Sequence, residues 1–330
     1  MIELNVQPYS SDHRTRWDEF VALSKNGTFL IQRGFLEYHS DRFTDASTIV
    51  TDAEGRIKAL FPANRSGKQI TSHGGLSYGG MISDETMTAP LALDVFAAWL
   101  NHCRRAGVSE IVYRSVPAIY HRMPADEDRY AIFYHGGDLY RRDVTSVIDF
   151  TAEAPVQERR RRGVRKALKA GLHFEEMSDI AEFWAILNQN LNSRHDTKPV
   201  HSLDEILLLR NRFPQNIRLF GVSGSGALHA GALLFCCGGT IHAQYIASSE
   251  EGRSQGALDL LFLTLIDRFR ESARYFDFGN SNENEGRHLN RGLIEFKEGF
   301  GARSIVQDFF RIDLDTWQSR ARPQGDEYGK

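Results

Sequence analysis

The sequence predicts an α+β fold with two domains in tandem, each a mostly antiparallel, mixed α/β sheet flanked by helices. Its 330 residues exceed the usual size of one domain and suit two. The two halves share a loose order of predicted elements: two helices, an antiparallel meander, a long helix, a strand and an ending strand. No repeat is visible in the residues themselves, so the duplication is inferred from element order alone.

Periodicity and turn residues place the elements of the first half. Trp17, Phe20 and Val21 recur at helical spacing and predict a helix over residues 15–23. In chain order, we then expect a short helix over 34–39, strands over 47–51 and 57–64, a helix over 89–106, and strands over 110–115, 131–135 and 144–150.

The domain boundary is predicted at residues 151–155, where a strand pattern gives way to a charged run. We expect an N-terminal domain over 1–152, a C-terminal domain over 153–318 and a polar tail over 319–330. The second domain is predicted to contain helices over 158–169, 180–191, 203–212, 257–270 and 289–300, and strands over 173–177, 218–222, 228–236, 240–248, 275–279 and 304–313.

Composition excludes several classes of protein. Hydrophobic residues make up 41% of the chain and charged residues 25%, which is typical of a folded globular protein. The net charge of −3 gives no global reason to bind DNA or an anionic membrane. No window approaches ~18 consecutive apolar residues and no secretory signal is recognisable, so we expect a cytoplasmic protein without a membrane span. The oligomeric state is not indicated.

The turn over residues 248–256 has the composition of a phosphate-binding loop. It follows a predicted strand and precedes a hydrophobic helix, whose first backbone N–H groups are free to bind an anion. Gly252 and Gly256 allow close approach of a ligand to the backbone, and Arg253 adds a positive charge. The alternative is an ordinary polar loop that caps a buried helix.

Two motifs carry a resemblance to a known family. Residues 253–257, Arg-Ser-Gln-Gly-Ala, resemble the acyl-CoA pyrophosphate loop of GNAT acyltransferases, with Leu258 where a small residue is usual. Residues 275–280 and 292–301 resemble the C-terminal signature of the FemAB-like and BioF2-like branch of that superfamily. The basic helix that opens the second half, predicted over residues 158–169, is also similar to that branch. Together these features span residues 158–310.

The resemblance implies two GNAT domains and acyl or aminoacyl transfer to an amine. The preferred interpretation is an N-acyltransferase that uses acyl-CoA, such as acetyl-CoA, as co-substrate. Its acceptor would be a small, possibly nucleotide-linked, amino sugar of bacterial surface-polysaccharide biosynthesis. The first alternative donor is aminoacyl-tRNA, which Leu258 and the basic helix favour. The second alternative is a non-catalytic binding module on a GNAT scaffold.

The resemblance also assigns the donor site to the second domain. The strand that precedes the loop would supply a backbone N–H to the thioester carbonyl. The residues expected to bind the acyl-CoA are Ile246, Ala247, Ser248, Arg253, Gln255, Gly256 and Ala257.

Two groups of residues are candidates for the base that accepts the proton of the attacking amine. His195 and Asp196 open a predicted loop that also contains Lys198 and His201, and the alternative is a solvated connection between helices. His242 and Tyr245 lie on the strand that leads into the donor loop. Strand alternation predicts that Tyr245 shares a face with Ala243 and that His242 lies on the other face.

The acceptor is expected to contact residues of both halves. Asp277 lies between two phenylalanines and should project from the opposite face, where it would orient the amine or pair with Lys297. Lys297 resembles the family lysine of the Phe-Lys-x-x-Phe-Gly motif, and Asn280 lies in the same signature. In the first half, the glycine-rich residues 72–80 contain His73 and Tyr78, and this stretch would serve acceptor contacts or domain packing.

The basic helix holds seven cations within residues 159–169. It is either a solvated face or a surface that attracts a nucleotide-linked or tRNA donor. No spacing of histidines, cysteines and carboxylates indicates a metal site, and no Gly-x-Ser-x-Gly elbow indicates a nucleophilic serine. The three cysteines are predicted to be packing residues in a reducing compartment.

Overall fold

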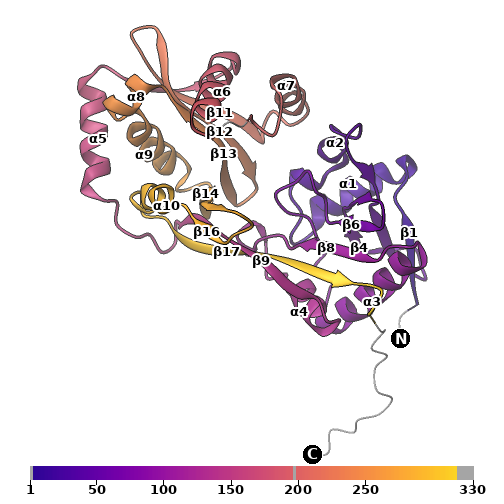
Figure 1. The fold of residues 1–330 in the computed structure, drawn as a ribbon. Coiled ribbons are helices and arrows are strands. Elements are labelled where there is room, and N and C mark those ends of the chain that lie inside the picture. The colour runs from indigo at the N-terminus through magenta and orange to yellow at the C-terminus, as the bar shows by residue number, and fades with distance from the viewer. Residues whose placement is uncertain (1–2, 196–197, 318–330) are drawn as a thin grey trace, which may run out of the picture.

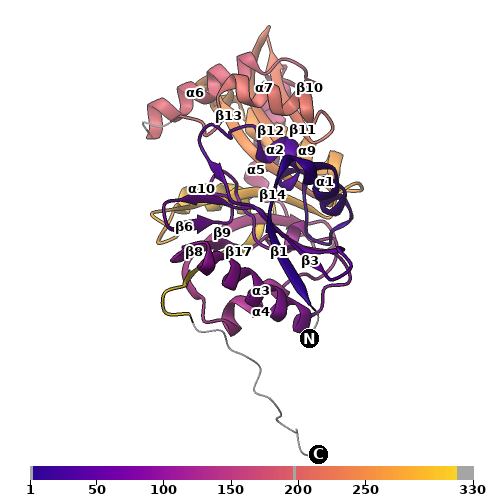
Figure 2. The ribbon, with the colours of Figure 1, turned by 90° about the vertical axis from the view of Figure 1, so that its right-hand side faces the viewer.

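The computed structural model describes residues 3–195 and 198–317. The predicted polar tail, Asp196 and residue 318 lie outside the described residues. Figure 1 shows two lobes that correspond to the two halves of the chain, with the long strands β9 and β17 running between them. In Figure 2, α6 and α7 of the second half and α3 and α4 of the first half lie at opposite ends of the molecule.

Most of the elements predicted for the first half are present in the structure. Its α-helices are α1 (Arg14–Leu23), α2 (Arg33–Leu36), α3 (Ala89–Arg105) and α4 (Glu127–Tyr134), and its short 3-10 helices are η1 (Ser11–His13), η2 (Phe29–Ile31) and η3 (Ala118–Tyr120). Its strands are β1 (Leu4–Pro8), β2 (Thr44–Asp45), β3 (Thr48–Asp52), β4 (Ile57–Phe61), β5 (Asn64–Ser66), β6 (Gln69–Thr71), β7 (Ile82–Ser83), β8 (Glu110–Arg114) and β9 (Asp138–Asp149).

The second half follows the predicted order closely. Its helices are α5 (Glu158–Lys169), α6 (Ala181–His195), α7 (Leu203–Arg212), α8 (Glu250–Gln255), α9 (Ala257–Phe269) and α10 (Arg291–Glu298). Its strands are β10 (His173–Met177), β11 (Ile217–Gly224), β12 (Ala227–Cys237), β13 (Thr240–Ser248), β14 (Tyr275–Asn280), β15 (Asn282–Glu283), β16 (His288–Leu289) and β17 (Arg303–Asp313).

The strand predicted over residues 131–135 is wrong, because residues 131–134 belong to helix α4 and His135 caps its end. Asp128, Ala131 and Ile132 are its buried residues. They are spaced by three and four positions, which places them on one face of a helix. The β-branched and aromatic residues of this stretch favour a strand locally, and burial of the helical face against α3 overrides that preference.

One sheet of 11 strands joins the two halves within the described residues, in the order β10-β11-β12-β13-β14-β9-β17-β8-β6-β5-β2. The halves exchange their last strands. β9, from the first half, pairs with β14, whereas β17, from the second half, pairs with β8. β9 and β17 also pair with each other from Val147↔Arg303 to Asp138↔Arg311. The predicted boundary at residue 152 falls in the connection after β9, and the division into two functional domains stays a prediction.

Three hydrophobic clusters flank this sheet. One packs α5 and α9 against the second-half strands through residues such as Phe262 and Phe276, and another packs α3 in the first half through Trp99. The third contains residues of both halves, among them Tyr120 and Tyr245. Because this third cluster is shared, a cavity that it borders can be lined by side chains from both halves.

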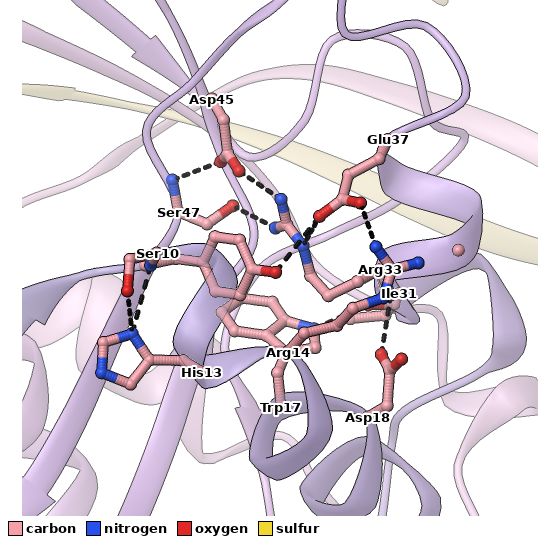
Figure 3. Close-up of polar contacts among 12 residues, drawn as sticks. Ser10, His13, Arg14, Trp17, Asp18, Ile31, Arg33, Glu37, Asp45 and Ser47 are labelled. Carbon is pink, nitrogen blue, oxygen red and sulfur yellow. Dashed lines mark hydrogen bonds and ion pairs between the residues drawn. The ribbon is translucent and has the colours of Figure 1, made fainter.

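A buried arginine fixes the N-terminal helices of the first half, as Figure 3 shows. The Arg33 side chain is 3% exposed, its Nε donates to Glu37 at 3.0 Å, and it also pairs with Asp45. Its guanidinium lies 3.6 Å from the centre of the Tyr9 ring. The backbone N–H of Arg33 donates to Asp18 at 2.7 Å, which ties α2 to α1. This network positions the segment that borders the shared cluster.

None of the helices in the described ranges combines the length and the apolar character that a membrane crossing requires.

Candidate active site

The candidate site lies where β13 and β14 separate. The two strands are parallel neighbours from Thr240↔Tyr275 to His242↔Asp277 only. Beyond this point β13 continues to Ser248 and β14 to Asn280 without pairing to each other. Backbone groups at the ends of both strands are therefore available to a ligand that enters the gap.

A β-bulge at Gln244 changes the alternation of side chains along β13. Leu233 of β12 pairs with Tyr245 and Leu234 with Ala243, so Gln244 is the extra residue. Ala243 packs in the cluster beside α9, whereas Tyr245 packs in the shared cluster. The prediction that Ala243 and Tyr245 share a face is therefore wrong, because a bulge adds one residue to the two-residue period.

Tyr245 is a buried packing residue rather than a partner of the base. The residue is 9% exposed, and its hydroxyl lies 2.6 Å from Nδ1 of His201. The ring makes an edge contact with Trp184 of α6. A catalytic role for Tyr245 is not supported, since it does not line the cavity that contains His242.

His242 and Asp277 form a hydrogen-bonded pair at the point of strand separation. The distance between Nδ1 of His242 and Oδ2 of Asp277 is 2.8 Å. The His242 side chain keeps 17% of its surface exposed, whereas that of Asp277 keeps 4%. No hydrogen bond to Nε2 of His242 is found within the described part of the chain. This arrangement leaves Nε2 directed at solvent or ligand.

The carboxylate of Asp277 is held in its charged form. Burial raises its pKa, but the charge and hydrogen bond of His242 and hydrogen bonds from Thr145 and Tyr120 lower the pKa to about 2. The Tyr120 hydroxyl donates at 2.7 Å and the Gly279 N–H at 2.8 Å. Because Asp277 can only accept, Nδ1 of His242 must carry the proton, and Nε2 is then the basic nitrogen.

Lys297 lies beside this pair but does not bond to Asp277. Its Nζ donates to the backbone oxygens of Gly279 at 2.8 Å and Asn280 at 2.7 Å. The predicted ion pair between Lys297 and Asp277 is therefore wrong, because His242 and the two hydroxyls already surround the carboxylate. Burial lowers the pKa of Lys297 to about 8, although the Asp277 charge raises it.

A cavity of about 400 Å³ opens beside His242, and we call it the His242 cavity. Its walls come from both halves of the chain. Its charged and polar lining residues are Ser77, Tyr78, Arg114, Tyr120, Arg141, Asp143, Thr145, His242, Gln244, Asp277, Asn280, Lys297 and Gln307. The predicted residues Tyr78, His242, Asp277, Asn280 and Lys297 are thus brought together. Tyr78 is a wall residue, with its hydroxyl 3.0 Å from that of Thr28.

A second cavity of about 660 Å³ lies beside the first turn of α9, and we call it the α9 cavity. Ile246, Leu293 and Lys297 line both cavities, which are therefore adjacent. Of the predicted donor-binding residues, Ile246, Ala247, Ser248, Arg253 and Gly256 line the α9 cavity. Gln255 and Ala257 do not line it: Gln255 bonds to Glu251, and Ala257 is fully buried.

The predicted phosphate loop is mostly helical. Residues 250–255 form α8, and the Ser249 hydroxyl caps its first turn by accepting from the Gly252 N–H at 2.9 Å. Gly256, at a φ of 82°, then redirects the chain into α9. Arg253 donates to the Ser248 carbonyl at 2.7 Å, so its guanidinium is anchored at the rim of the α9 cavity. The Ser249 hydroxyl cap stabilises a helix where the sequence predicted a loop.

The remaining predicted residues lie elsewhere. His195 ends α6, its side chain is not described, and Asp196 lies outside the described residues. His73 lines neither cavity. It is buried, with its ring 5.1 Å from that of His39. Contact between His73 and an acceptor in the His242 cavity is therefore not supported.

Several residues of the site were not predicted from the sequence. Tyr120 and Thr145 hydrogen-bond to Asp277, and Arg114 lines the same cavity. All three belong to the first half: Thr145 lies on β9 beside β14, Arg114 ends β8 beside β17, and Tyr120 belongs to η3. The only local signal was at Arg114, where a charged residue ends the apolar strand β8.

The buried histidines make the fold sensitive to acid. Burial lowers the pKa of His73 to about 3 and that of His39 and His201 to about 4. The unfolded chain, with pKa values near 6.5, therefore binds more protons than the folded chain below that pH, and stability falls as the pH falls from about 6.5 toward 3–4.

Replacing His73 with Asn tests this acid sensitivity. Asn tolerates the φ of 51° at this position. Between pH 7 and pH 5, urea unfolding should show a loss of stability that is smaller by about 1–2 kcal/mol in the variant than in the wild type. An identical pH dependence in both proteins would show that His73 is not held neutral.

Comparisons with known proteins agree with this architecture. Residues 156–297 match the family of acetyltransferase (GNAT) domains. Among solved structures, FemX superposes with a TM-score of 0.65 at 13% identity, over 92% of this chain and 96% of that chain. L-PGS from Bacillus licheniformis gives a TM-score of 0.58 at 15% identity, over 94% and 93%. No curated protein matches the sequence significantly.

A tandem GNAT protein from the clavulanic acid biosynthesis pathway, solved without acetyl-CoA, gives a TM-score of 0.51 at 12% identity, over 94% of this chain and 99% of that chain. The second half of the chain is thus a GNAT domain, and the whole chain has a tandem GNAT fold. The family match identifies residues 156–297 as a GNAT domain, and the likeness to the solved structures confirms the tandem fold class predicted from the sequence.

Among the described residues, no cluster of three or more histidine, cysteine, aspartate or glutamate side chains is arranged to hold a metal ion.

Proposed function

We propose that the protein transfers an acyl group from an acyl-CoA thioester to an amino group of a small acceptor, with His242 as the general base. The observation that carries this proposal is the position of the His242–Asp277 pair at the separation of β13 and β14, beside two adjacent cavities. We assign the α9 cavity to the donor and the His242 cavity to the acceptor. The reacting carbonyl would lie where they meet.

The acyl transfer needs no covalent enzyme intermediate. The acceptor nitrogen attacks the thioester carbonyl carbon as its proton passes to Nε2 of His242, and the carbon–sulfur bond then breaks. The departing CoA thiolate takes up a proton, either the one held by His242 or one from water. Asp277 holds the imidazole in the required tautomer and stabilises its positive charge after proton uptake. Asp277 therefore acts as a positioning residue.

Backbone N–H groups of β13 are the candidates to stabilise the oxyanion of the tetrahedral intermediate. The bulge at Gln244 interrupts the ladder to β12, and β14 has already separated from β13 after His242. Ile246 and Ala247 line the α9 cavity. Both still pair with β12, so only one of their two backbone N–H groups points away from β12 into the gap. An N–H donor fixed in a strand requires little reorganisation during the reaction, which supports its use for an oxyanion.

The shape and polarity of the α9 cavity suit the pantetheine arm of CoA. Leu187, Leu191, Leu258 and Phe296 give it apolar walls, and Arg253 lies at its rim. We propose a nucleotide-linked amino sugar of bacterial surface-polysaccharide biosynthesis as acceptor. The cationic lining of the His242 cavity supports this choice.

An aminoacyl-tRNA donor is the second candidate, and the exposed face of α5 favours it. Six cations of this helix are exposed: Arg159, Arg161, Arg162, Arg165, Lys166 and Lys169. Arg160 of the same helix lines the α9 cavity and pairs with Asp259 at 2.9 Å. A Cβ atom on Gly256 would lie 2.5 Å from the Gly163 carbonyl, so α5 packs closely over the start of α9, where a diphosphate would bind.

Replacing Arg253 with Glu distinguishes these donors. If acyl-CoA is the donor, the variant should show a Michaelis constant for acyl-CoA raised about tenfold or more, because a cation at the cavity rim becomes an anion. Arg268→Glu, at the far end of α9, is the matched control and should leave the constant unchanged. Thermal unfolding should also shift upward with acetyl-CoA or longer acyl-CoA esters in the wild type.

The opposite result would favour tRNA. No thermal shift with any acyl-CoA ester, together with tRNA binding that weakens steeply as salt rises, would reject the acyl-CoA proposal. An unchanged Michaelis constant in Arg253→Glu would remove Arg253 from the donor site without rejecting the cavity.

A further inference from the structure

The Arg114 side chain lies in the wall of the His242 cavity, and none of the described carboxylates forms an ion pair with it. Arg114 ends β8 in the first half of the chain. Its Nη1 donates to the backbone oxygen of Leu76 at 2.9 Å, and its Cζ lies 5.5 Å from the centre of the Phe309 ring. The hydrogen bond to Leu76 and the contact with the Phe309 ring together hold the guanidinium in the wall of the cavity.

The remaining hydrogen-bonding capacity of Arg114 is unused. Its Nε is buried and has no partner within the described part of the chain. For the same residues, no hydrogen bond to its Nη2 is found and no carboxylate lies within ion-pair distance of the guanidinium. Burial lowers the pKa of Arg114, which is the direction expected for a cation that has lost water and gained no counter-ion.

The other cations of the cavity are already satisfied. Arg141 donates to Asp143 with two bonds of 3.0 Å and 2.6 Å. Asp143 also accepts from Asn280 at 3.1 Å, so its oxygens are engaged and it acts on Arg114 only through space. Lys297 donates to two backbone carbonyls. Among the described cations of this cavity, Arg114 is therefore the one that has neither a carboxylate partner nor an acceptor for its Nε.

Arg114 is half-buried, and an unpaired cation that is partly removed from water is costly unless a ligand supplies the opposite charge. Arg114 and His242 line one cavity of about 400 Å³, a volume that holds a small molecule in contact with both. A planar guanidinium with free N–H groups matches the oxyanions of phosphate and carboxylate.

We propose that Arg114 binds an oxyanion of the acceptor and so places the acceptor's amino group beside Nε2 of His242. This inference rests on the proposed function for the role of the bound molecule, and it narrows the acceptor to amines that also carry a phosphate or carboxylate. The first half of the chain then determines acceptor specificity, whereas the second half supplies the base.

Calorimetric titration of the full-length protein with inorganic pyrophosphate, and separately with acetate, tests the anion site. We expect the wild type to bind at least one of these anions and Arg114→Met to bind it about tenfold more weakly or worse, since a charge-assisted pair is lost. Preference for pyrophosphate would indicate a phosphorylated acceptor, and preference for acetate a carboxylated one. Arg114→Lys keeps the charge without the planar fork and should bind with intermediate strength.

Arg311→Met is the matched control. Arg311 lies on β17 opposite Val112 of β8, and it does not line the His242 cavity. This variant should bind the anion as the wild type does. If Arg114→Met does not fold, the comparison of Arg114→Lys with the wild type decides the result. Equal binding by the wild type and the Arg114 variants, or no binding by the wild type up to tens of millimolar, would overturn the inference.

Anion binding by Arg114 can be tested separately from acyl transfer by His242. His242→Ala should retain anion binding that depends on Arg114, because the base is not a ligand of the anion. Anion binding through Arg114 in a protein without acyl-CoA binding would leave the anion site intact and reject the proposed donor. Acyl transfer that needs His242 but is indifferent to Arg114 would reject the anion site alone.

Discussion

Replacing His242 with Ala is expected to lower the turnover of acyl transfer by about 10²–10⁴-fold, the usual contribution of a positioned general base. The variant should still fold, because Asp277 keeps its hydrogen bonds from Tyr120, Thr145 and the Gly279 N–H. The Michaelis constant for the donor should change little, since His242 does not line the α9 cavity. Release of CoA thiol with an acceptor amine present measures this effect.

Asp277→Asn separates positioning from proton transfer. An amide at this position presents a donor or a weaker acceptor to Nδ1, so the imidazole loses both its fixed tautomer and the stabilisation of its cationic form. Turnover should fall toward that of His242→Ala, with donor binding retained. His173→Ala is the control, because the His173 side chain is 64% exposed on the edge strand β10. Wild-type turnover in His242→Ala would show that another group accepts the proton.

Removing both carboxylate partners of Arg33, in a Glu37→Gln and Asp45→Asn double variant, should destabilise the fold by about 3–5 kcal/mol. The Arg33 side chain is 3% exposed, so its charge would remain buried without a counter-ion. Urea unfolding monitored by circular dichroism measures the change.

Arg33→Met is the control for this prediction. It removes the charge and keeps most of the packing against the Tyr9 ring. Glu37 and Asp45 are 29% and 38% exposed, so their carboxylates can return to water when the guanidinium is absent. Arg33→Met should therefore cost less than the double variant. The reverse order would mean that packing, and not charge pairing, dominates at Arg33.

Arg33 and Arg114 differ in their charge partners. Both guanidinium groups are held in the first half of the chain and lie against aromatic rings. Arg33 has carboxylate partners, whereas no ion pair of Arg114 occurs in the described ranges. An unpaired cation such as Arg114 lowers the stability of the free protein. Under the proposal, binding of an anionic ligand in the cavity beside His242 offsets that cost.

Much of the second half could be predicted from the sequence because its elements are locally specified. The predicted and observed bounds of the strand over residues 240–248 are the same. Asp277 does project opposite Phe276 and Phe278, which pack beside α9. Strand alternation was sufficient for that residue, since β14 is regular from Tyr275 to Asp277 where it pairs with β13.

Features that depend on pairing partners could not be predicted in this way. The bulge at Gln244 is visible only in the register between β12 and β13, and it reverses the facing of Tyr245. Residues 250–255 could form either a loop or a helix, and the Ser249 cap favours the helix α8. In each case, the local pattern permitted two structures and a specific hydrogen-bond partner selected one.

The largest omission was a set of three first-half residues of the site: Tyr120, Thr145 and Arg114. Thr145 reaches Asp277 because β9 is inserted beside β14, and Arg114 reaches the same cavity because β17 brings β8 alongside. Tyr120 reaches Asp277 from η3, which follows β8 in the chain. Strand exchange between halves leaves no periodic signal in a single sequence. For the same reason, His73 was expected near the acceptor on the basis of element order, but it packs against His39 instead.

A crystal structure of the protein with a bound acyl-CoA thioester is the most direct test of the proposed reaction. The pantetheine arm should occupy the α9 cavity between β13 and α10, with the thioester at the strand separation. Its carbonyl should lie near the one backbone N–H of the Ile246–Ala247 pair that points away from β12. The acyl group should point toward Nε2 of His242. A thioester bound elsewhere, or an α9 cavity left empty at saturating thioester, would contradict the assignment of the donor site.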